Sequence, residues 1–308
     1  MSGRVTSLEQ AKPQPLVHPC SLSTQGTIPL PLLFLITKQS RAPVRGSAWL
    51  EFARSRAGAG AWAGAGQQRG PPLSSQPCRA LYLFAKSNNI PFEFKRVELM
   101  KGQHKSKEFR KVNPMMKVPA LEDGSFLLSE SIAILLYLAR KFKTPDHWYP
   151  SDLQKRARVD EYLSWQHANI RAKSSDVFVS KFMLPVLVGQ PLPPKKLEEI
   201  VEELNTVLKQ FEVQFLQDKP FIAGSEVSLA DLVALVELMQ PVGAGHNLFE
   251  EKPKLAEWRS RVEAAVGPKL FEEAHQTILK AKYMTPDKIP PVVLEVIKSQ
   301  ALKQIGQA

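Results

Sequence analysis

The spacing of apolar positions divides the chain into a first part without a regular period and a second part with one. Over residues 1–74, apolar residues sustain neither the alternation of a strand nor the 3.6-residue period of a helix. From about Ser75 onward, helical and strand periods appear together with suitable capping and turn residues. The pattern predicts a low-complexity, disordered extension over residues 1–72, followed by folded domains.

The pattern over residues 73–144 predicts a small α/β domain. Ser75 precedes a helix-like segment with Pro77 in its first turn, which is typical of a helix start. Residues 92–97 alternate as in a strand, and residues 117–128 predict a β-hairpin. Ser129 is expected to cap a further helix with an apolar stripe.

One strand is missing from this arrangement. The predicted order of helix, strand, connection, hairpin and helix is the latter part of a βαβ–ββα unit, so a strand should precede Ser75. Residues 63–72 are instead rich in glycine and proline, which are poor strand formers. Residues 28–36 or 48–52 could supply a substitute, but at least 20 residues would then loop out before the serine. Without a substitute, neighbouring strands lose backbone partners and the serine loses its support.

Residues 152–282 carry helical periods and predict an all-helical domain, reached through a linker over residues 145–151. Apolar residues at 3-4 spacing form a stripe from Leu197 to Phe215. Ser228-Leu-Ala-Asp231 has the spacing of a capping box, in which the acidic side chain accepts from the backbone of the serine. Residues 283–308 form a C-terminal tail in this interpretation.

Composition excludes several classes of protein. The longest apolar stretch, residues 28–36, is nine residues long and contains two prolines, whereas a bilayer crossing needs about 20. Cys20 and Cys78 are too few for a disulfide framework, and no Cys/His metal pattern accompanies them. We therefore predict a protein of a reducing compartment with no membrane span and no metal site.

The net charge of +11 is unevenly distributed. Residues 1–74 contain eight basic and two acidic residues, and so carry +6 of this charge. Nucleic-acid binding would need a basic stripe interleaved with aromatic residues, whereas here the excess charge is sparsely spread along a tail. A basic, acid-poor beginning also loosely resembles a mitochondrial presequence, so we predict a cytoplasmic protein with a mitochondrial location as the alternative.

Short motifs follow one another in a fixed order between residues 75 and 282. They are Ser75-Gln-Pro-Cys-Arg-Ala-Leu-Tyr-Leu-Phe-Ala-Lys86, Val97-Glu-Leu-Met-Lys-Gly-Gln-His104, Val112-Asn-Pro114, Lys117-Val-Pro-Ala-Leu121, Ser129-Glu-Ser131, Pro145-Asp-His-Trp-Tyr-Pro150, Ala157-Arg-Val-Asp-Glu-Tyr-Leu163, Ser228-Leu-Ala-Asp231 and Pro253-Lys-Leu-Ala-Glu-Trp-Arg259. Together they resemble the theta class of glutathione S-transferases. The resemblance implies an α+β thioredoxin-like N-terminal domain joined to an all-α C-terminal domain, a homodimer, and glutathione as the co-substrate.

The chemistry of that family needs a thiolate, and a free thiol is mostly protonated at neutral pH. A hydroxyl at a helix N-terminus can donate a hydrogen bond to sulfur where the helix dipole also favours negative charge. By resemblance Ser75 is this catalytic hydroxyl; the alternative is that Ser75 only caps the helix. Ser74 is the neighbour with which it is most easily confused. Cys78 could be a reactive thiol, but a small buried side chain is the simpler interpretation.

Glutathione also carries two carboxylates and an ammonium group, which call for opposite charges and backbone hydrogen bonds. A basic group lies between two predicted strands and faces either a ligand or solvent: Lys101, His104, Lys105 and Lys107. The residues assigned to glutathione are His104, Lys105, Lys117, Val118, Glu130 and Ser131. By resemblance, Val118 precedes a cis proline and pairs with the cysteinyl group through its backbone. Arg171 matches an arginine near the electrophile pocket, although it could be a surface residue at a helix end.

Two functional hypotheses result. In the first, the chain conjugates glutathione to small hydrophobic electrophiles, such as organic halides or peroxides, through a serine-stabilised thiolate. In the second, it is a catalytically weak or inactive transferase-like protein with a binding or structural role, because its central first strand is missing.

Overall fold

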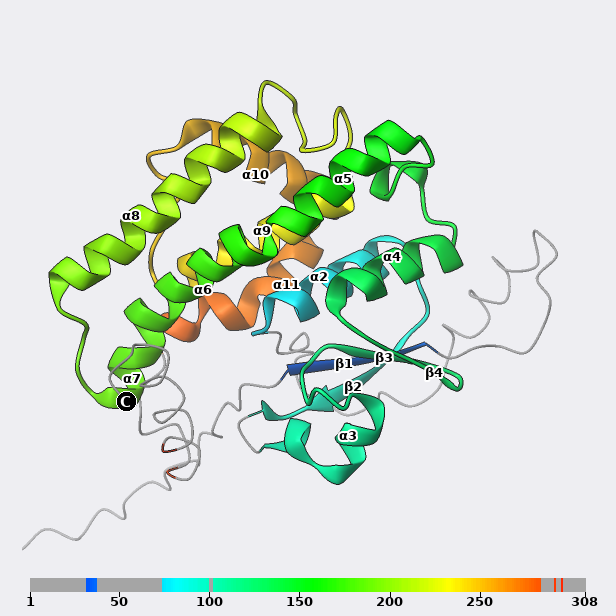
Figure 1. Ribbon diagram of the computed structural model, residues 1–308, viewed down its shortest axis with the longest axis horizontal. Helices are drawn as coiled ribbons and strands as arrows, with labels where there is room; N and C mark the ends of the chain where they lie inside the picture. Colours follow the sequence, from blue (N-terminus) through cyan, green and yellow to red (C-terminus); the bar gives the residue numbers. More distant parts are fainter. Residues whose placement is uncertain (1–31, 38–73, 100–101, 284–290, 292–294, 296–308) are drawn as a thin grey trace, which may run out of the picture.

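The computed structural model describes residues 32–37, 74–99, 102–283, 291 and 295, and it divides them into a small sheet-containing unit and a larger helical unit (Figure 1). The small unit contains β1 (Leu32–Thr37), α2 (Gln76–Ser87), β2 (Glu93–Val97), η2 (Gln103–Lys105), α3 (Lys107–Val112), β3 (Ala120–Asp123), β4 (Phe126–Ser129) and α4 (Ser131–Lys141). The larger unit contains η3 (Asp146–Trp148), α5 (Leu153–Trp165), η4 (His167–Arg171), α6 (Ala172–Phe178), η5 (Val179–Met183), α7 (Leu184–Val188), α8 (Pro194–Gln210), η6 (Phe211–Leu216), α9 (Leu229–Gly243), α10 (Pro253–Val266), α11 (Pro268–Leu279) and η7 (Ala281–Tyr283).

The four strands form one sheet in the order β2-β1-β3-β4, and β1 lies inside it. Leu32 pairs with Val97 of β2, and Leu35 pairs with both Phe94 of β2 and Leu121 of β3. The β3–β4 hairpin is antiparallel, as the sequence predicts. A segment far upstream of Ser75 therefore completes the sheet, and it overlaps the first of the two candidate substitutes. The second candidate, residues 48–52, lies outside the described residues, as do residues 1–31 and 38–73.

The direction of β1 differs from the expected βαβ arrangement. A βαβ unit requires its two strands to be parallel, but β1 is antiparallel to β2 and parallel to β3. Residues 38–75 separate the end of β1 from the start of α2. A chain of that length can span far more than one strand, at up to about 3.3 Å per residue, so the connection does not dictate which way β1 runs. The predicted boundaries of the extension and of the two domains remain predictions.

Helix α2 is buried on every side. All residues from Pro77 to Ala85 are buried, including the charged Arg79. In Figure 1, α2 and α4 lie on the face of the sheet that is directed toward the helical unit, and α3 lies on the opposite face. An all-round buried helix needs partners on both faces, and here these are the sheet with α4 on one side and α9 with α11 on the other.

Helix α9 is the centre of the helical unit. Its residues from Leu229 to Pro241 are all buried, among them the acidic Asp231 and Glu237. The predicted capping box is confirmed: Asp231 Oδ2 accepts hydrogen bonds from Ser228 N (3.0 Å) and Ser228 Oγ (2.8 Å). Asp231 Oδ1 also accepts from Ile222 N and from Trp258 Nε1, both at 2.9 Å. The helix start is thereby joined to α10.

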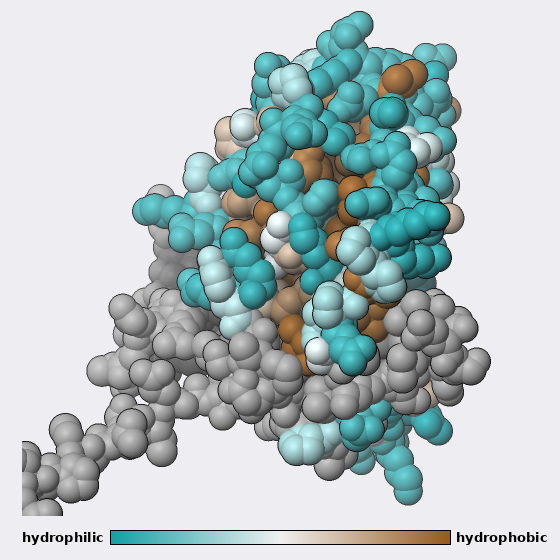
Figure 2. All heavy atoms as spheres, turned by 90° about the vertical axis from the view of Figure 1, so that its left-hand side faces the viewer, coloured by the Kyte–Doolittle hydropathy of each residue, from teal (hydrophilic) through white to brown (hydrophobic). Residues whose placement is uncertain are grey.

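The outer helices carry the polar surface. Helix α8 buries Leu204, Val207 and Leu208, and its glutamates and lysines are exposed. Figure 2 shows the end of the molecule where α7 and α8 lie, with hydrophilic side chains over most of the coloured surface and apolar ones between them. None of the helices formed by the described residues is both long enough and apolar enough to cross a membrane.

Candidate functional site

The sheet register brings the predicted glutathione-binding segments to one edge. Leu32 begins β1 and pairs with Val97, which ends β2. Because β3 runs parallel to β1, its first residue, Ala120, lies toward that same edge, and Ala120 pairs with Ser129 at the end of β4. The segments that follow β2, precede β3 and follow β4 therefore leave the sheet together. The first turns of α2 and α4 also lie toward this end of the sheet (Figure 1).

Ser75 occupies the N-cap position of α2, as the sequence predicts. Its backbone is extended (φ −82°, ψ 128°), and its side chain makes no capping hydrogen bond with any described residue. The Ser75 carbonyl accepts the first helical hydrogen bond, from Arg79 N at 3.0 Å. The side chain is half-buried, so the helix leaves the hydroxyl available without placing it fully in solvent. Cys78, one turn further on, is completely buried.

His104 and Lys105 lie in the short turn η2, after the end of β2. Burial and the adjacent charge of Lys105 lower the pKa of His104, so its imidazole is neutral at pH 7. His104 Nδ1 is buried and has no hydrogen-bond partner among the described residues. Lys105 is exposed, whereas Lys101 lies outside the described residues. His104 can therefore offer a hydrogen bond, and the positive charge of this turn comes from lysine.

The segment before β3 contains a cis peptide bond between Val118 and Pro119, which confirms the prediction made from the resemblance. Asn113 is buried, and its Nδ2 donates to the carbonyl of Lys117 at 2.7 Å. This hydrogen bond fixes the backbone just ahead of Val118. The Lys117 side chain is exposed at the same edge of the sheet.

Glu130 and Ser131 connect β4 to α4. The N-cap position of α4 belongs to Glu130, so the prediction that Ser129 caps this helix was wrong: Ser129 is the last residue of β4. Glu130 is exposed and has a left-handed backbone with φ of 67°, which is uncommon for a residue with a long side chain. Ser131 is buried in the first turn. Backbone outliers of this kind gather at functional sites, which makes this junction a candidate for ligand contact.

Arg171 is the last residue of η4 in the helical unit. Its Nη1 lies 3.6 Å from Glu237 Oε1, and the Glu237 side chain is 1% exposed. Burial raises the pKa of Glu237 to about 7, although the charges of Arg171 and Arg79 oppose this change. Arg171 is therefore paired with a buried carboxylate rather than simply ending a helix at the surface. Its assignment to an electrophile pocket stays a prediction.

Sequence reasoning missed the buried polar contacts between α2 and α9. Arg79 is fully buried, and its guanidinium donates to Ser74 O, Val236 O and Gln240 Oε1, each at 2.8 Å. The sequence did offer a signal for these contacts. Arg79 in α2 and Glu237 in α9 are each a charged residue within a run of apolar ones. A charge in such a position must find a partner, because burying it alone is costly.

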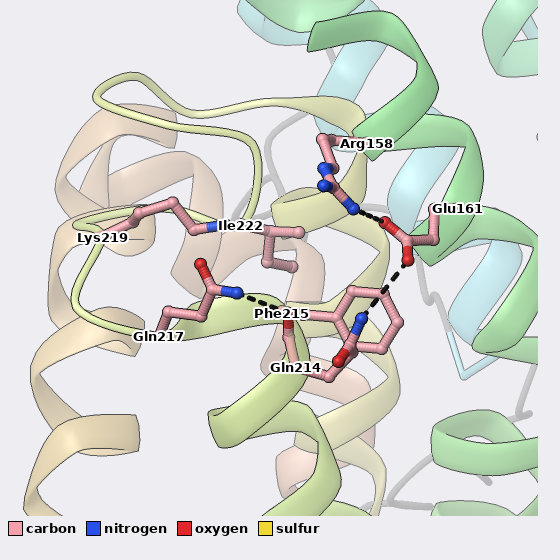
Figure 3. Close-up of a pocket in the computed structure, with 7 residues that line it drawn as sticks. All are labelled: Arg158, Glu161, Gln214, Phe215, Gln217, Lys219 and Ile222. Atoms are coloured by element: carbon pink, nitrogen blue, oxygen red, sulfur yellow. Dashed lines mark hydrogen bonds and ion pairs between the residues drawn. The ribbon is translucent and has the colours of Figure 1, made fainter. Parts of the chain in front are cut away.

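A small hollow in the helical unit lies apart from these residues (Figure 3). It is formed between α5 and the segment from η6 to Ile222, with a volume of about 60 Å³. Ligand pockets usually enclose roughly 300–1,000 Å³, so a tripeptide does not fit there. The Arg158–Glu161 ion pair (2.8 Å) occupies its rim, and none of the predicted site residues lines it. Within the described part of the chain, no cluster of three or more potential metal ligands occurs.

Comparison with protein families finds two matches along the chain. The model for the glutathione S-transferase N-terminal domain matches residues 72–140, and the model for the C-terminal domain matches residues 176–265. Theta-1 glutathione S-transferase of Bos taurus is 57% identical over 232 residues, which cover 73% of this chain and 97% of that protein. The corresponding protein of Homo sapiens is 56% identical over the same shares of both chains.

Solved structures give the same result. The apo form of human glutathione S-transferase T1-1 superposes with a TM-score of 0.71 at 55% identity, covering 74% of this chain and 95% of that one. Human theta-2, described as a complex with glutathione and an unknown ligand, superposes with a TM-score of 0.69 at 48% identity, over 74% of this chain and 95% of that one. The fold is the thioredoxin-like and all-helical pair of domains expected from the sequence. The chain belongs to the theta class of the glutathione S-transferases, a class of glutathione-conjugating enzymes.

Proposed function

We propose that this chain conjugates glutathione to small electrophiles, such as organic halides or peroxides, through a thiolate stabilised by Ser75. The observation that carries the proposal is the hydroxyl of Ser75 at the N-cap of a 12-residue helix, which makes no capping hydrogen bond among the described residues. The helix N-terminus favours negative charge, and a hydroxyl that caps nothing can donate to sulfur. A hydrogen bond to a charged acceptor is worth about 1.5–3 kcal/mol, enough to shift a thiol toward its thiolate at neutral pH.

The same edge of the sheet offers complements to the charges of glutathione. In this proposal His104, Lys105 and Lys117 approach the glycine carboxylate. The Val118 backbone pairs with the cysteinyl group, as the family resemblance implies. Glu130 and Ser131 hold the γ-glutamyl end, where the exposed carboxylate meets the ammonium group. Arg171 lies on the electrophile side.

Turnover of the purified chain is the first test, with glutathione and a haloalkane as substrates. Ser75→Ala should lower kcat about 10- to 100-fold while changing the KM for glutathione much less, because the hydroxyl acts on developing charge. Ser74→Ala is the matched control, since its side chain is the neighbouring hydroxyl. A larger loss in the control than in Ser75→Ala would show that the register of the site is wrong.

The second hypothesis, a catalytically weak relative, is supported by the reversed strand β1. If it is correct, the purified chain should turn over slowly, and replacing residues 1–73 by a strand that runs directly into Ser74 should raise kcat. If the replacement leaves kcat unchanged, the upstream strand supports the site as well as a regular one, and the weak-activity hypothesis is rejected.

We also propose a homodimer. Phe126 and Leu127 of the edge strand β4 are 45% and 41% exposed, and Met115 is 49% exposed, so apolar surface is available on the small domain. Light scattering on the purified chain should give twice the mass of one chain. Phe126→Ser should shift that mass toward the monomer if this surface takes part.

A further inference from the structure

The first turn of α2 is not held by a short connection to the sheet. Residues 38–75 separate it from β1, whereas connections between neighbouring strands and helices are usually about 2–6 residues long. Ser75 must nevertheless be fixed if its hydroxyl is to face a thiol. The described residues around the helix start supply contacts of this kind.

Arg79 supplies such contacts on the C-terminal side of Ser75. Its backbone N–H donates to Ser75 O at 3.0 Å, and its Nη1 donates to Ser74 O at 2.8 Å. One residue thus binds the carbonyls of both serines. The next residue makes a second contact with the helical domain: Gln76 Nε2 donates a hydrogen bond to Ser175 Oγ in α6 at 3.2 Å.

The guanidinium of Arg79 is itself held by the helical domain. Its Nη2 donates to Val236 O and to Gln240 Oε1 in α9, both at 2.8 Å, and the side chain is 0% exposed. The planar fork of arginine can reach the Ser74 carbonyl ahead of α2 and two acceptors on α9 at once, which the single ammonium of lysine cannot do in the same geometry. The position of the Ser74 carbonyl therefore depends on α9.

The charge of Arg79 interacts with the carboxyl group of Glu237 on α9. Glu237 attracts Arg79 and also lies 3.6 Å from Arg171 Nη1, so one buried carboxylate serves two arginines. Burial lowers the pKa of Arg79 to about 10, which leaves it charged at neutral pH. His275 of α11 adds no competing charge, because burial and the charge of Arg79 hold its pKa well below the usual value.

From these contacts we propose that Arg79 is a positioning residue for Ser75: it ties the backbone of the two serines to α9, and Glu237 holds its guanidinium in place. The inference rests on the proposed role of Ser75. The contacts that hold the serine then lie at the interface between the domains. In a fold with a short connection, the strand before the serine would also hold it. Arg171, through the shared carboxylate, connects the same network to the electrophile side.

A double-mutant cycle tests this proposal with the full chain. Arg79→Lys keeps the charge but loses the fork, and it should lower kcat about 10-fold with less than about a threefold change in the KM for glutathione. In the Ser75→Ala background the same substitution should lower kcat less than about twofold, because Arg79 acts through the hydroxyl that is already gone. The ultraviolet absorbance of bound thiolate, followed against pH, should show a raised thiol pKa in Arg79→Lys as in Ser75→Ala.

The control is Arg261→Lys in α10, another arginine that donates to a backbone carbonyl, that of Pro220 at 3.0 Å. It should leave kcat and the thiol pKa unchanged. Equal losses from Arg79→Lys in both backgrounds, or no loss in either, would overturn the positioning role while leaving that of Ser75 intact. An unchanged kcat in Ser75→Ala alone would overturn the proposed function, and the inference with it. Should Arg79→Lys not fold, Glu237→Gln replaces it in the cycle under the same criterion, with a smaller expected loss of about threefold.

Discussion

The two domains are specified by contacts of very different range along the chain. At the start of α9, Ser228 and Asp231 are three residues apart, and they complete their hydrogen bonds within one helical turn. In the small domain, Leu35 pairs with Phe94 and Leu121, although both residues lie far from it along the sequence. Local contacts form at little entropic cost, whereas distant ones require a long loop to close. The helical domain should therefore tolerate changes upstream of Ser75 that the sheet does not.

The largest effect is expected from removing the acceptor that organises the helical domain. Asp231→Ala leaves the donors of Ile222, Ser228 and Trp258 unpaired in a buried position. Each such loss costs about 1–3 kcal/mol, so the free energy of unfolding should fall by about 4 kcal/mol in urea titrations. Asp218→Ala is the control, because this exposed carboxylate only lies 3.5 Å from Lys254, and its loss should cost less than about 0.5 kcal/mol. Equal effects of the two would contradict the importance of the local cap.

A somewhat smaller effect is expected in the sheet. Leu35→Pro removes a backbone donor from a strand with partners on both sides, and we expect a loss of about 3 kcal/mol. Amide exchange should accelerate in residues 93–97 and 120–123 while it stays slow in α9. Trp49→Pro, in the other candidate segment, should have little effect. The opposite result would mean that residues 48–52 supply the central strand.

The interface between the domains should respond to pH through Glu237. Its folded-state pKa of about 7 lies above the ordinary 4.5, so the folded state binds this proton more tightly and loses stability as the pH rises between these values. Glu237→Gln removes this dependence. As the pH rises from about 4.5 to about 7, the free energy of unfolding of the variant minus that of the original chain should increase by roughly 2–3 kcal/mol. If the difference between the two proteins stays flat with pH, then Arg79 and Arg171 keep Glu237 ionised throughout.

The smallest effect is expected at the hollow in Figure 3. Arg158 and Glu161 form an exposed pair one turn apart, and such pairs contribute about 0–1 kcal/mol. Arg158→Ala should change the free energy of unfolding by less than about 0.5 kcal/mol and leave turnover unchanged. A marked loss of turnover would indicate a functional role for this hollow.

Features that depend on neighbouring residues could be predicted from the sequence. The helix start after Ser75, the strand before Val97, the hairpin and the capping box at Ser228 all leave a local pattern, and the structure confirms each of them. The cap of α4 was misjudged because two serines flank Glu130, and only the backbone of Glu130 shows which residue occupies the N-cap.

Features that depend on distant partners could not be predicted. Nothing in residues 32–37 indicates which strands flank them or in which direction they run, because alternation and propensity are the same for both directions. Arg79 and Glu237 stand out locally as charges among apolar residues, but the sequence does not pair them. The site residues were located through the family resemblance rather than through a local pattern.

The long separation between β1 and α2 has a consequence for how such a chain can arise. Closure entropy grows only as about (3/2)RT ln n, so joining over 38 residues instead of about three costs roughly 2 kcal/mol more. That amount is comparable to a single unfavourable substitution. A sheet can therefore accept its central strand from an unrelated stretch of sequence, in either direction, provided that the stretch is apolar enough. The strand that completes this sheet is in that sense exchangeable among apolar segments upstream of α2.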